Sequence, residues 1–311
     1  MKMKSNKASI LLVFMIQIVM FNVHAQEQAN FYSFYVGDIR VIALSDGIVS
    51  TDAQKLFREE EPGQIVHLLE KSGIRNPVDI PVNAYLIVRE EKRLLIDTGA
   101  GDFLDIPSAG KLTQSLRLAG YRPEDITDIY LTHVHADHSG GLTLNGQVVY
   151  PNATLHLHEK EYAYWMNSAY LSGMEGDAKE FFLKEQSILA AYGNRIETFK
   201  GSSRLLPGFR SISIPGHTPG HSAFELQSKG RKIIFWGDLV HIDAIQFVLP
   251  ELDDTYDIDM EKGKMQRTKM YARMAQKAVL VAGAHLKFPG IGWVRRSEKG
   301  YEWLHFPKPH F

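Results

Sequence analysis

The sequence predicts one domain of the α/β class, in which strands and helices form separate layers. Three observations support this prediction. Short runs rich in β-branched and aromatic residues are separated by segments with helical periodicity. The chain of 311 residues is 44% hydrophobic and 23% charged, which is ordinary for a globular domain. No internal repeat, low-complexity tract or long linker divides the sequence, so a single domain is the simplest organisation.

Two hairpins are predicted in the first third of the chain. One pairs residues 34–36 with 39–44 around a Gly-Asp turn, and the other pairs 84–88 with 93–97 across a charged turn. Further strands are expected at 128–132, 154–158, 211–214, 222–226, 232–236 and 279–282, with a closing hairpin of 293–296 and 301–305. Helices are expected at 62–71, 111–119, 160–166, 178–191 and 260–277.

The first 25 residues have the pattern of a secretory signal peptide. Three lysines precede an apolar run at 10–21, and Val23-His24-Ala25 offers a small-residue cleavage site. A membrane anchor is the alternative, but the run is short for a bilayer span and contains Gln17. We therefore expect cleavage after Ala25, no stable membrane insertion afterwards, and export of residues 26–311 to the periplasm or the medium.

Charge and cysteine content exclude several classes of function. Without the three lysines of the signal segment, 32 basic residues face 36 acidic ones, a net charge of about −4. No basic stripe or arm is visible, which argues against a nucleic-acid partner. The chain has no Cys, so neither disulfides nor a thiolate ligand or nucleophile can contribute. The core and any bound metal must stabilise the fold.

The densest polar signal lies at residues 131–142, which read LTHVHADHSGGL. The segment follows a buried-strand pattern and runs into loop residues, so it marks the end of a strand. His133 and His135 alternate, so they lie on one face of an extended segment and can bind one ion. Asp137 and His138 follow after a turn and can face a second ion. This density of imidazole and carboxylate groups predicts a metal site.

Ligand-type side chains also end three later hydrophobic runs. His217 lies in the Gly- and Pro-rich loop PGHTPGH, Asp238 ends the motif WGD, and His285 ends GAH. The carboxylate of Asp238 has two oxygens and can bridge two ions. Several strands that each end in a ligand-type residue are expected for a site built at one edge of a sheet.

These motifs together resemble the metallo-β-lactamase superfamily of metal-dependent hydrolases. The matching motifs are HxHxDH, GHTPGH, WGD, the late GAH and the upstream LIDTG at 95–99. The closer resemblance is to methyl parathion hydrolases and related exported lactonases, over nearly the whole mature chain. It is most specific in NAYL at 83–86, GDL at 237–239, AIQF at 244–247 and GAHLKFPGIG at 283–292. The resemblance implies a four-layered αββα sandwich with metals at the edge of two facing sheets.

The same resemblance implies a centre for two divalent ions. Its ligands would be His133, His135 and His217 for one ion, Asp137, His138 and His285 for the other, and Asp238 as the bridge. Zinc is favoured, although Mn, Co or Fe would also suit imidazoles and carboxylates. Outside the ligand set, His221 is expected to stabilise its loop by a hydrogen bond, and Asp97 to orient a ligand histidine. His156 and His158 match no ligand position and are expected at the surface.

The implied chemistry is hydrolysis. Two ions that share a water lower its pKa and yield a bridging hydroxide. We expect this hydroxide to open the lactone ring of N-acyl-homoserine lactones, the reaction of quorum quenching. The alternative is an organophosphate triesterase of the methyl parathion hydrolase type, and an exported zinc-storage protein is a third reading. The expected partner is a small apolar lactone or ester, and a homodimer is left open.

Other branches of the superfamily fit the sequence less well. Class B1 and B2 β-lactamases use a Cys ligand, and class B3 enzymes lack a bridging carboxylate. Flavodiiron reductases carry Glu at the position of Ala136 and append a flavin domain. Glyoxalase II has a helical C-terminal domain that the predicted closing hairpin does not provide.

The resemblance also suggests residues around the substrate. Phe103, Trp165 and Phe182 fall where methyl parathion hydrolases place aromatic residues, and Phe247 could extend the same apolar groove, although core packing explains helical aromatics about as well. Asp137 and His241 are the residues expected to act in catalysis. Many lactonase relatives carry Tyr at the position of His241, where its hydroxyl supports the substrate carbonyl. His241 could donate an N–H to that oxygen instead, or it could be a loop histidine that faces solvent.

Overall fold

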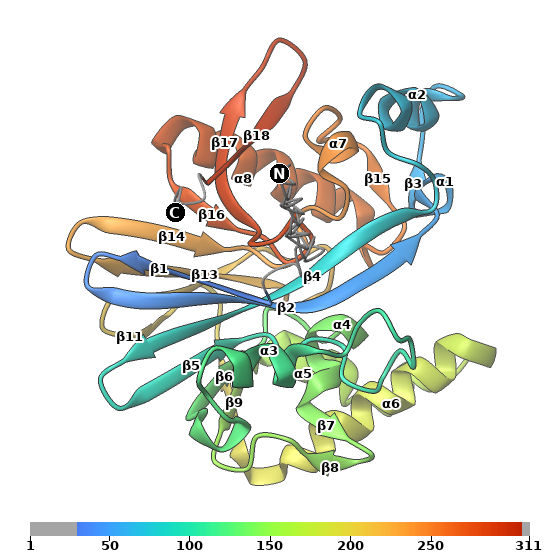
Figure 1. The fold of residues 1–311 in the computed structure, drawn as a ribbon. Coiled ribbons are helices and arrows are strands. Elements are labelled where there is room, and N and C mark those ends of the chain that lie inside the picture. The colour runs from blue at the N-terminus through green and yellow to red at the C-terminus, as the bar shows by residue number, and fades with distance from the viewer. Residues whose placement is uncertain (1–29, 307–311) are drawn as a thin grey trace, which may run out of the picture.

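The computed structural model describes residues 30–306 as two seven-stranded sheets packed face to face, with helices on both outer sides (Figure 1). The predicted four-layered αββα arrangement in a single domain is confirmed. The predicted signal peptide at 1–25 lies outside the described residues, so it stays a prediction. Within residues 30–306, no helix is both long and apolar enough to cross a membrane.

The first sheet comes from the N-terminal part of the chain, in the strand order β1-β2-β4-β5-β6-β9-β10. In this order the strands span Phe31–Val36, Ile39–Thr51, Val78–Arg89, Lys92–Ile96, Asp128–Tyr130, Thr154–His158 and Ile196–Phe199. The strands from β1 to β5 are paired antiparallel, whereas β5, β6, β9 and β10 run parallel. The carboxyl ends of the parallel strands therefore meet at one edge of the sheet.

The second sheet comes from the C-terminal part, in the order β11-β12-β13-β14-β16-β17-β18. In this order the strands span Arg204–Leu206, Phe209–Ser213, Ser222–Ser228, Arg231–Phe235, Leu280–Ala282, Ile291–Arg296 and Tyr301–His305. The pair β14 and β16 is parallel, and the other neighbouring strands are antiparallel. β14 and β16 consequently end side by side.

The alternation of apolar residues along the strands explains the layers. In β2, Val41 and Ala43 belong to the cluster between the two sheets, whereas Ile42 and Leu44 belong to the cluster under the outer helices. The helices on the outer side of the first sheet are α3 (Leu112–Leu118), α5 (Glu159–Trp165) and α6 (Gly176–Tyr192). The outer side of the second sheet is covered by α8 (Met260–Lys277).

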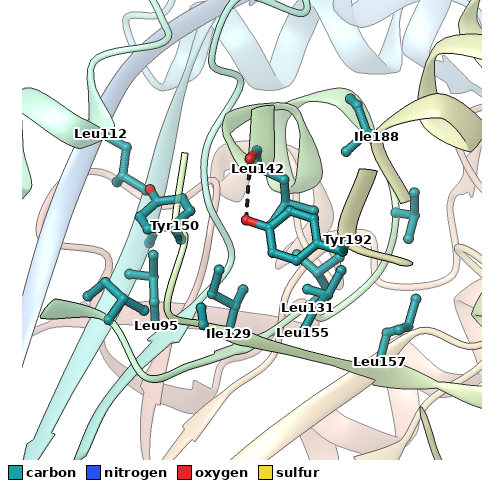
Figure 2. Packing of buried hydrophobic residues seen from close by; sticks show 14 of the residues in the cluster. Leu95, Leu112, Ile129, Leu131, Leu142, Tyr150, Leu155, Leu157, Ile188 and Tyr192 are labelled. Carbon is teal, nitrogen blue, oxygen red and sulfur yellow. Dashed lines mark hydrogen bonds between the residues drawn. The ribbon is translucent and has the colours of Figure 1, made fainter. Parts of the chain in front are cut away.

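Figure 2 shows part of the outer cluster on the first sheet. Leu95, Ile129 and Leu155 come from three neighbouring strands and pack against Tyr150 and Tyr192. The Tyr192 hydroxyl donates a hydrogen bond of 3.3 Å to the carbonyl oxygen of Leu142. This closely packed cluster supports the segment that follows β6.

Every predicted strand and helix is present, and several strands are longer than predicted, β2 and β4 by the most. β2 and β4 continue together beyond the sheet, and the pairing shifts register between Ser45 and Gly47. Gly47 has a φ of 125°, and a Cβ there would clash with the carbonyl oxygen of Ser108. Asp46 and Gly47 are residues typical of a turn, but in the structure they form a bulge. For this reason the extensions of β2 and β4 were not predicted.

Short elements complete the chain. They are α1 (Ala53–Leu56), β3 (Phe57–Arg58), α2 (Gln64–Lys71), η1 (Pro123–Asp125), α4 (Ala136–Ser139), η2 (Gly140–Leu142), β7 (Thr143–Leu144), β8 (Gln147–Val148), η3 (Ser168–Leu171), η4 (Gly193–Arg195), α7 (Asp243–Gln246) and β15 (Asp253–Asp254). Of these, only α2 is long enough for its periodicity to show in the sequence.

Candidate metal centre

The structure brings all seven predicted ligands together at one end of the facing sheets. They follow β6, lie in the loop between β12 and β13, and follow β14 and β16. In chain order they are His133, His135, Asp137, His138, His217, Asp238 and His285. Five of the seven are buried, and His135 and Asp137 are partly exposed. The ends of β6, β14 and β16 and the loop after β12 position this cluster at the edge of the two facing sheets, as predicted.

One group of ring nitrogens converges from His133, His135 and His217. Nε2 of His217 lies 3.2 Å from Nε2 of His133 and 2.9 Å from Nδ1 of His135. Nε2 of His133 lies 3.1 Å from the same Nδ1. A neutral imidazole has one N–H, and His217 directs its other nitrogen to Asp257, at 2.9 Å. Its Nε2 lone pair therefore points into the group, where a cation would satisfy all three nitrogens.

The second group contains Asp137, His138 and His285. Oδ2 of Asp137 lies 3.4 Å from Nε2 of His285 and 3.6 Å from Nε2 of His138. The three candidate ligand atoms, one from each of these residues, all lie within 4.8 Å of one another. Nitrogen and carboxylate oxygen at such spacing suit a divalent transition-metal ion.

Asp238 lies between the two groups. Its Oδ1 is 3.0 Å from Nε2 of His138, and its Oδ2 is 3.1 Å from Nε2 of His285. The same Oδ2 lies 3.4 Å from Nε2 of His217 and 3.6 Å from Nε2 of His133. A carboxylate in this place can contribute an oxygen to each of two ions.

Unpaired buried atoms support the fit of this cluster to metal ions. Nε2 of His138 and Oδ1 of Asp238 are buried and lie 3.0 Å apart, but their geometry is not that of a hydrogen bond, and neither has another partner among the described residues. Leaving such groups unpaired is costly, because water no longer solvates them. A cation between them would satisfy both. The donor set of imidazoles and carboxylates without thiolate suits zinc and also admits Mn, Co or Fe.

Hydrogen bonds behind the histidines orient their rings. The partners are Asp97 for His138 (Nδ1 to Oδ2, 3.0 Å), Asp257 for His217 (Nδ1 to Oδ1, 2.9 Å) and the carbonyl oxygen of Pro81 for His285 (2.8 Å). Each Nδ1–H donates outward, so each Nε2 lone pair points into the cluster. The predicted role of Asp97 is thus confirmed. Asp97 also has a φ of 60°, a strained conformation for a residue other than glycine.

The other histidines in the motifs have structural roles. His221 belongs to neither group, and its Nε2 accepts a hydrogen bond of 3.2 Å from the backbone N–H of Asp238, which confirms the predicted loop contact. His156 is partly buried and stacks on Tyr130 at 4.4 Å.

The prediction that His158 lies at the surface is wrong. Its side chain is buried, with ring nitrogens 3.1 Å from the backbone nitrogen of Lys160 and 2.9 Å from that of Gly201. It serves as the N-cap of α5. A cap is needed here because the first backbone N–H groups of a helix lack partners within it.

His241 is buried beside the two groups, so the solvent-facing reading is wrong. Its Nδ1 lies 2.7 Å from Oδ2 of Asp254, and its Nε2 lies 3.1 Å from Oδ2 of Asp238. Asp254 also accepts a hydrogen bond from Gln246 and lies 3.8 Å from the guanidinium of Arg267. The ring is therefore held in place, with one edge directed at Asp238.

The predicted pocket residues lie in the core. Phe103, Trp165 and Phe182 belong to the buried cluster under α6. Phe247 belongs to a different cluster, on the outer side of the second sheet, where it packs against Tyr271 at 4.9 Å. The prediction that Phe247 extends the same groove is corrected, because the second sheet separates it from the other three aromatics.

Two cavities open beside the histidines, and different residues line them. The smaller, of about 60 Å³, is lined by Val49, Thr51, Ile80 and Tyr256 together with His241 and five of the seven predicted ligands, which are His135, Asp137, His217, Asp238 and His285. The larger, of about 450 Å³, shares His241 and His285 with the smaller one. Its further lining residues are Ile74, Arg75, Pro77, Val78, Asp79, Pro81, Ile242, Asp243 and Lys287. Six of these nine residues come from the unpredicted extension of β4 and from the segment before it, whereas the extension of β2 contributes Val49 and Thr51 to the smaller cavity.

Phe181 is the aromatic residue of α6 that sequence reasoning missed. Its ring lies 4.9 Å from that of Phe103 and 6.4 Å from that of His135. It is partly exposed, whereas Phe182 is buried. Successive residues of a helix point about 100° apart, so an assignment shifted by one position selects the wrong face.

Trp165→Phe is expected to act through stability. The indole N–H of Trp165 donates a hydrogen bond of 2.9 Å to buried Glu161, so its loss should lower the free energy of unfolding by about 1.5–2 kcal/mol. Thermal or urea unfolding measures this change. KM for substrates of different chain length should change by one common factor. A larger KM increase for long chains than for short ones would instead make Trp165 part of the substrate pocket.

The metal ligands are the part of this site that sequence motifs indicate. The residues behind them gave no such signal. Asp254 lies in the short strand β15, Asp257 in the turn after it and Arg267 in α8, yet Arg267 reaches both carboxylates, at 3.8 and 3.6 Å. Only the fold brings this buried cation to the two acids.

Residues 77–285 match the family model of the metallo-beta-lactamase superfamily. Among curated proteins, an N-acyl homoserine lactonase from a Bacillus species is 30% identical over 170 residues, which cover 49% of this chain and 60% of the relative. An N-acyl homoserine lactonase from Bacillus cereus is 28% identical over 201 residues, 57% of this chain and 71% of the relative. The match to the first relative thus spans less than two thirds of its length.

Two solved structures superpose on nearly the whole described chain. The hydrolase AbOPH of the beta lactamase superfamily has a TM-score of 0.83 and 33% identity, covering 90% of this chain and 99% of its own. AidC, a dizinc quorum-quenching lactonase solved with a product, has a TM-score of 0.85 and 26% identity, covering the same shares of 90% and 99%.

Proposed function

Since the chain belongs to the metallo-beta-lactamase superfamily, we propose that it is a dinuclear metal-dependent hydrolase that opens the lactone ring of N-acyl-homoserine lactones. The observation that carries the proposal is the position of Asp238 between two groups of ligand-type side chains. The relatives named as N-acyl homoserine lactonases favour the lactone as substrate.

Two divalent ions bound at this centre would lower the pKa of a shared water and polarise the carbonyl oxygen of the substrate. The chain supplies the orientation. Asp97, Asp257 and the Pro81 carbonyl hold three histidine rings with one nitrogen facing inward. Because these contacts are present before substrate binds, no reorganisation is required during the reaction.

Asp137 has a second role in this proposal. Hydrolysis adds the oxygen of water to the carbonyl carbon, breaks the ring C–O bond and delivers one proton to the departing alkoxide. The side chain of Asp137 is 21% exposed, against 3% for that of Asp238, and it lines the smaller cavity. The carboxylate of Asp137 therefore reaches the cavity, and we assign the transfer of this proton to it.

The substrate class is tested by comparing kcat/KM for a long-chain N-acyl-homoserine lactone with that for methyl paraoxon, on protein loaded with zinc. We expect the lactone to be favoured by at least about tenfold, or about 1.4 kcal/mol. A preference for the phosphotriester would support the organophosphate triesterase instead. Turnover of neither compound, with two ions bound, would support the storage protein.

We also propose export after cleavage of residues 1–25, on the strength of the N-terminal sequence pattern. Cell fractionation followed by N-terminal sequencing should find a periplasmic or secreted chain that begins at Gln26. An intact N-terminus in the membrane fraction would contradict this proposal.

A further inference from the structure

Glu161 is a fully buried acid on α5 that the chemistry above does not use. Both of its carboxylate oxygens accept hydrogen bonds. Oε1 accepts from the backbone N–H of Val134 (2.8 Å) and the indole N–H of Trp165 (2.9 Å). Oε2 accepts from the hydroxyl of Thr218 (2.6 Å) and the backbone N–H of Gly220 (2.8 Å). Four donors thus surround one side chain.

Three of these donors come from the two loops that carry the first group of ligands, and the fourth, Trp165, lies on α5 itself. Val134 lies between His133 and His135, and Thr218 directly follows His217. The second loop also packs closely on α5, because a Cβ on Gly220 would clash with the backbone of Glu161. The carboxylate therefore links the His133 loop to the His217 loop from behind, with the helix as a fixed support.

The hydrogen bonds define what Glu161 must offer its neighbours. Two backbone N–H groups and an indole N–H can only donate, so three of the four contacts require an acceptor oxygen. Burial raises the pKa of Glu161, and a proton on its carboxyl group would have to face the Thr218 hydroxyl, the one partner that can also accept. In either protonation state, acceptor oxygens face Val134, Trp165 and Gly220, and all four partners are neutral groups, so exact geometry is needed to stabilise the buried side chain.

We propose that Glu161 is a positioning residue that sets the spacing between the His133 loop and the His217 loop, and thereby the affinity for the ion held by His133, His135 and His217. This inference rests on the proposed function only in that the centre binds metal. Glu161 touches neither the ion nor the substrate in this proposal, and it acts through the two loops.

Glu161→Gln tests the proposal with a minimal change of shape. The amide would place its NH₂ group against N–H donors in either orientation, toward Gly220 or toward Val134 and Trp165. The loops should move apart by a small amount, and zinc affinity, measured by chelator competition, should fall 10- to 100-fold. The unfolding of the metal-free protein is measured in parallel.

Glu185→Gln is the matched control, because Glu185 is also a fully buried acid on the same side of the sheet. The hydroxyl of Ser139 lies 2.6 Å from one of its oxygens, and the other oxygen has no partner among the described residues. Burial raises the pKa of Glu185 to about 8, so the side chain is already neutral and the amide replaces it closely. Zinc affinity of this variant should stay within about twofold of the wild type.

Thr218→Val removes one donor and keeps the carboxylate, so it serves if Glu161→Gln fails to fold. It should weaken zinc binding several-fold. The proposal is overturned if the folded Glu161 or Thr218 variants bind zinc as tightly as the wild type while only their melting temperatures fall. If the wild type binds two ions but does not hydrolyse the lactone, the proposed function is contradicted and the role of Glu161 is not affected. If the wild type binds no ions, both the proposed function and the role of Glu161 are contradicted.

Discussion

Asp238→Ala is expected to abolish hydrolysis of every substrate and to lower the metal content of the protein. Asp238 is the side chain that contacts both groups, with oxygens 3.0 Å from His138 Nε2 and 3.1 Å from His285 Nε2. Without the negative charge of Asp238, the buried site would hold two cations with one carboxylate fewer to balance them, and the repulsion between the cations is strong at short range. Metal content by elemental analysis and kcat/KM for the lactone measure the two effects.

Asp238→Asn is the control for a general loss of structure. The amide keeps the volume of the side chain and removes the charge, so a fold that merely needs the space to be filled would recover activity. We expect no recovery, because an amide cannot donate an anionic oxygen to each of two ions. Two tightly bound ions with near-normal turnover in Asp238→Ala would show that Asp238 is not the bridge.

The sequence predicted the ligands well because local rules apply to them. They lie shortly after hydrophobic strands, and strands that end at the same edge bring distant residues together. His133 and His135 also signal their role by spacing alone. These features need no knowledge of how the sheets pack.

The surroundings of the ligands depend on packing, and this explains what the sequence could not predict. Glu161 lies on an ordinary amphipathic helix, and its four partners are spread from Val134 to Gly220. The lining of the smaller cavity also depends on packing. Val49 and Ile80 are paired across the extensions of β2 and β4, and the bulge in β2 has a sequence typical of a turn. Side-chain direction on helices was the further source of error, as Phe181 and Phe182 illustrate.

His241 differs from the ligands in that its role requires hydrogen on both ring nitrogens. Burial lowers the pKa of His241, but the carboxylates of Asp254 and Asp238 raise it well above its usual value, which favours the imidazolium form. Its Nδ1 faces Asp254, which is buried and also contacted by Gln246 and Arg267. The opposite nitrogen, Nε2, is directed at Oδ2 of Asp238, and the ring lines both cavities beside the centre. A substrate carbonyl bound next to Asp238 would meet this edge of the ring.

His241→Phe should therefore lower kcat for lactones on the order of 10²-fold, or about 2.7 kcal/mol, while both ions stay bound. Negative charge builds on the carbonyl oxygen as the ring is attacked, and phenylalanine keeps the planar ring but removes the N–H donor. Phosphotriesters with good leaving groups should lose less. Steady-state kinetics on both substrates, with metal analysis of the same sample, give these values.

His241→Tyr is the matched variant, because the resemblance to lactonases implies tyrosine at this position in many of them. Its hydroxyl restores a donor, so kcat should recover to within about tenfold of the wild type, or about 1.4 kcal/mol. Both His241→Phe and His241→Tyr leave Asp254 without its histidine partner. A loss of kcat caused only by the unpaired Asp254 would therefore be equal in the two variants. The donor role is refuted if metal-replete His241→Phe turns over lactone within about twofold of the wild type, a difference of about 0.4 kcal/mol.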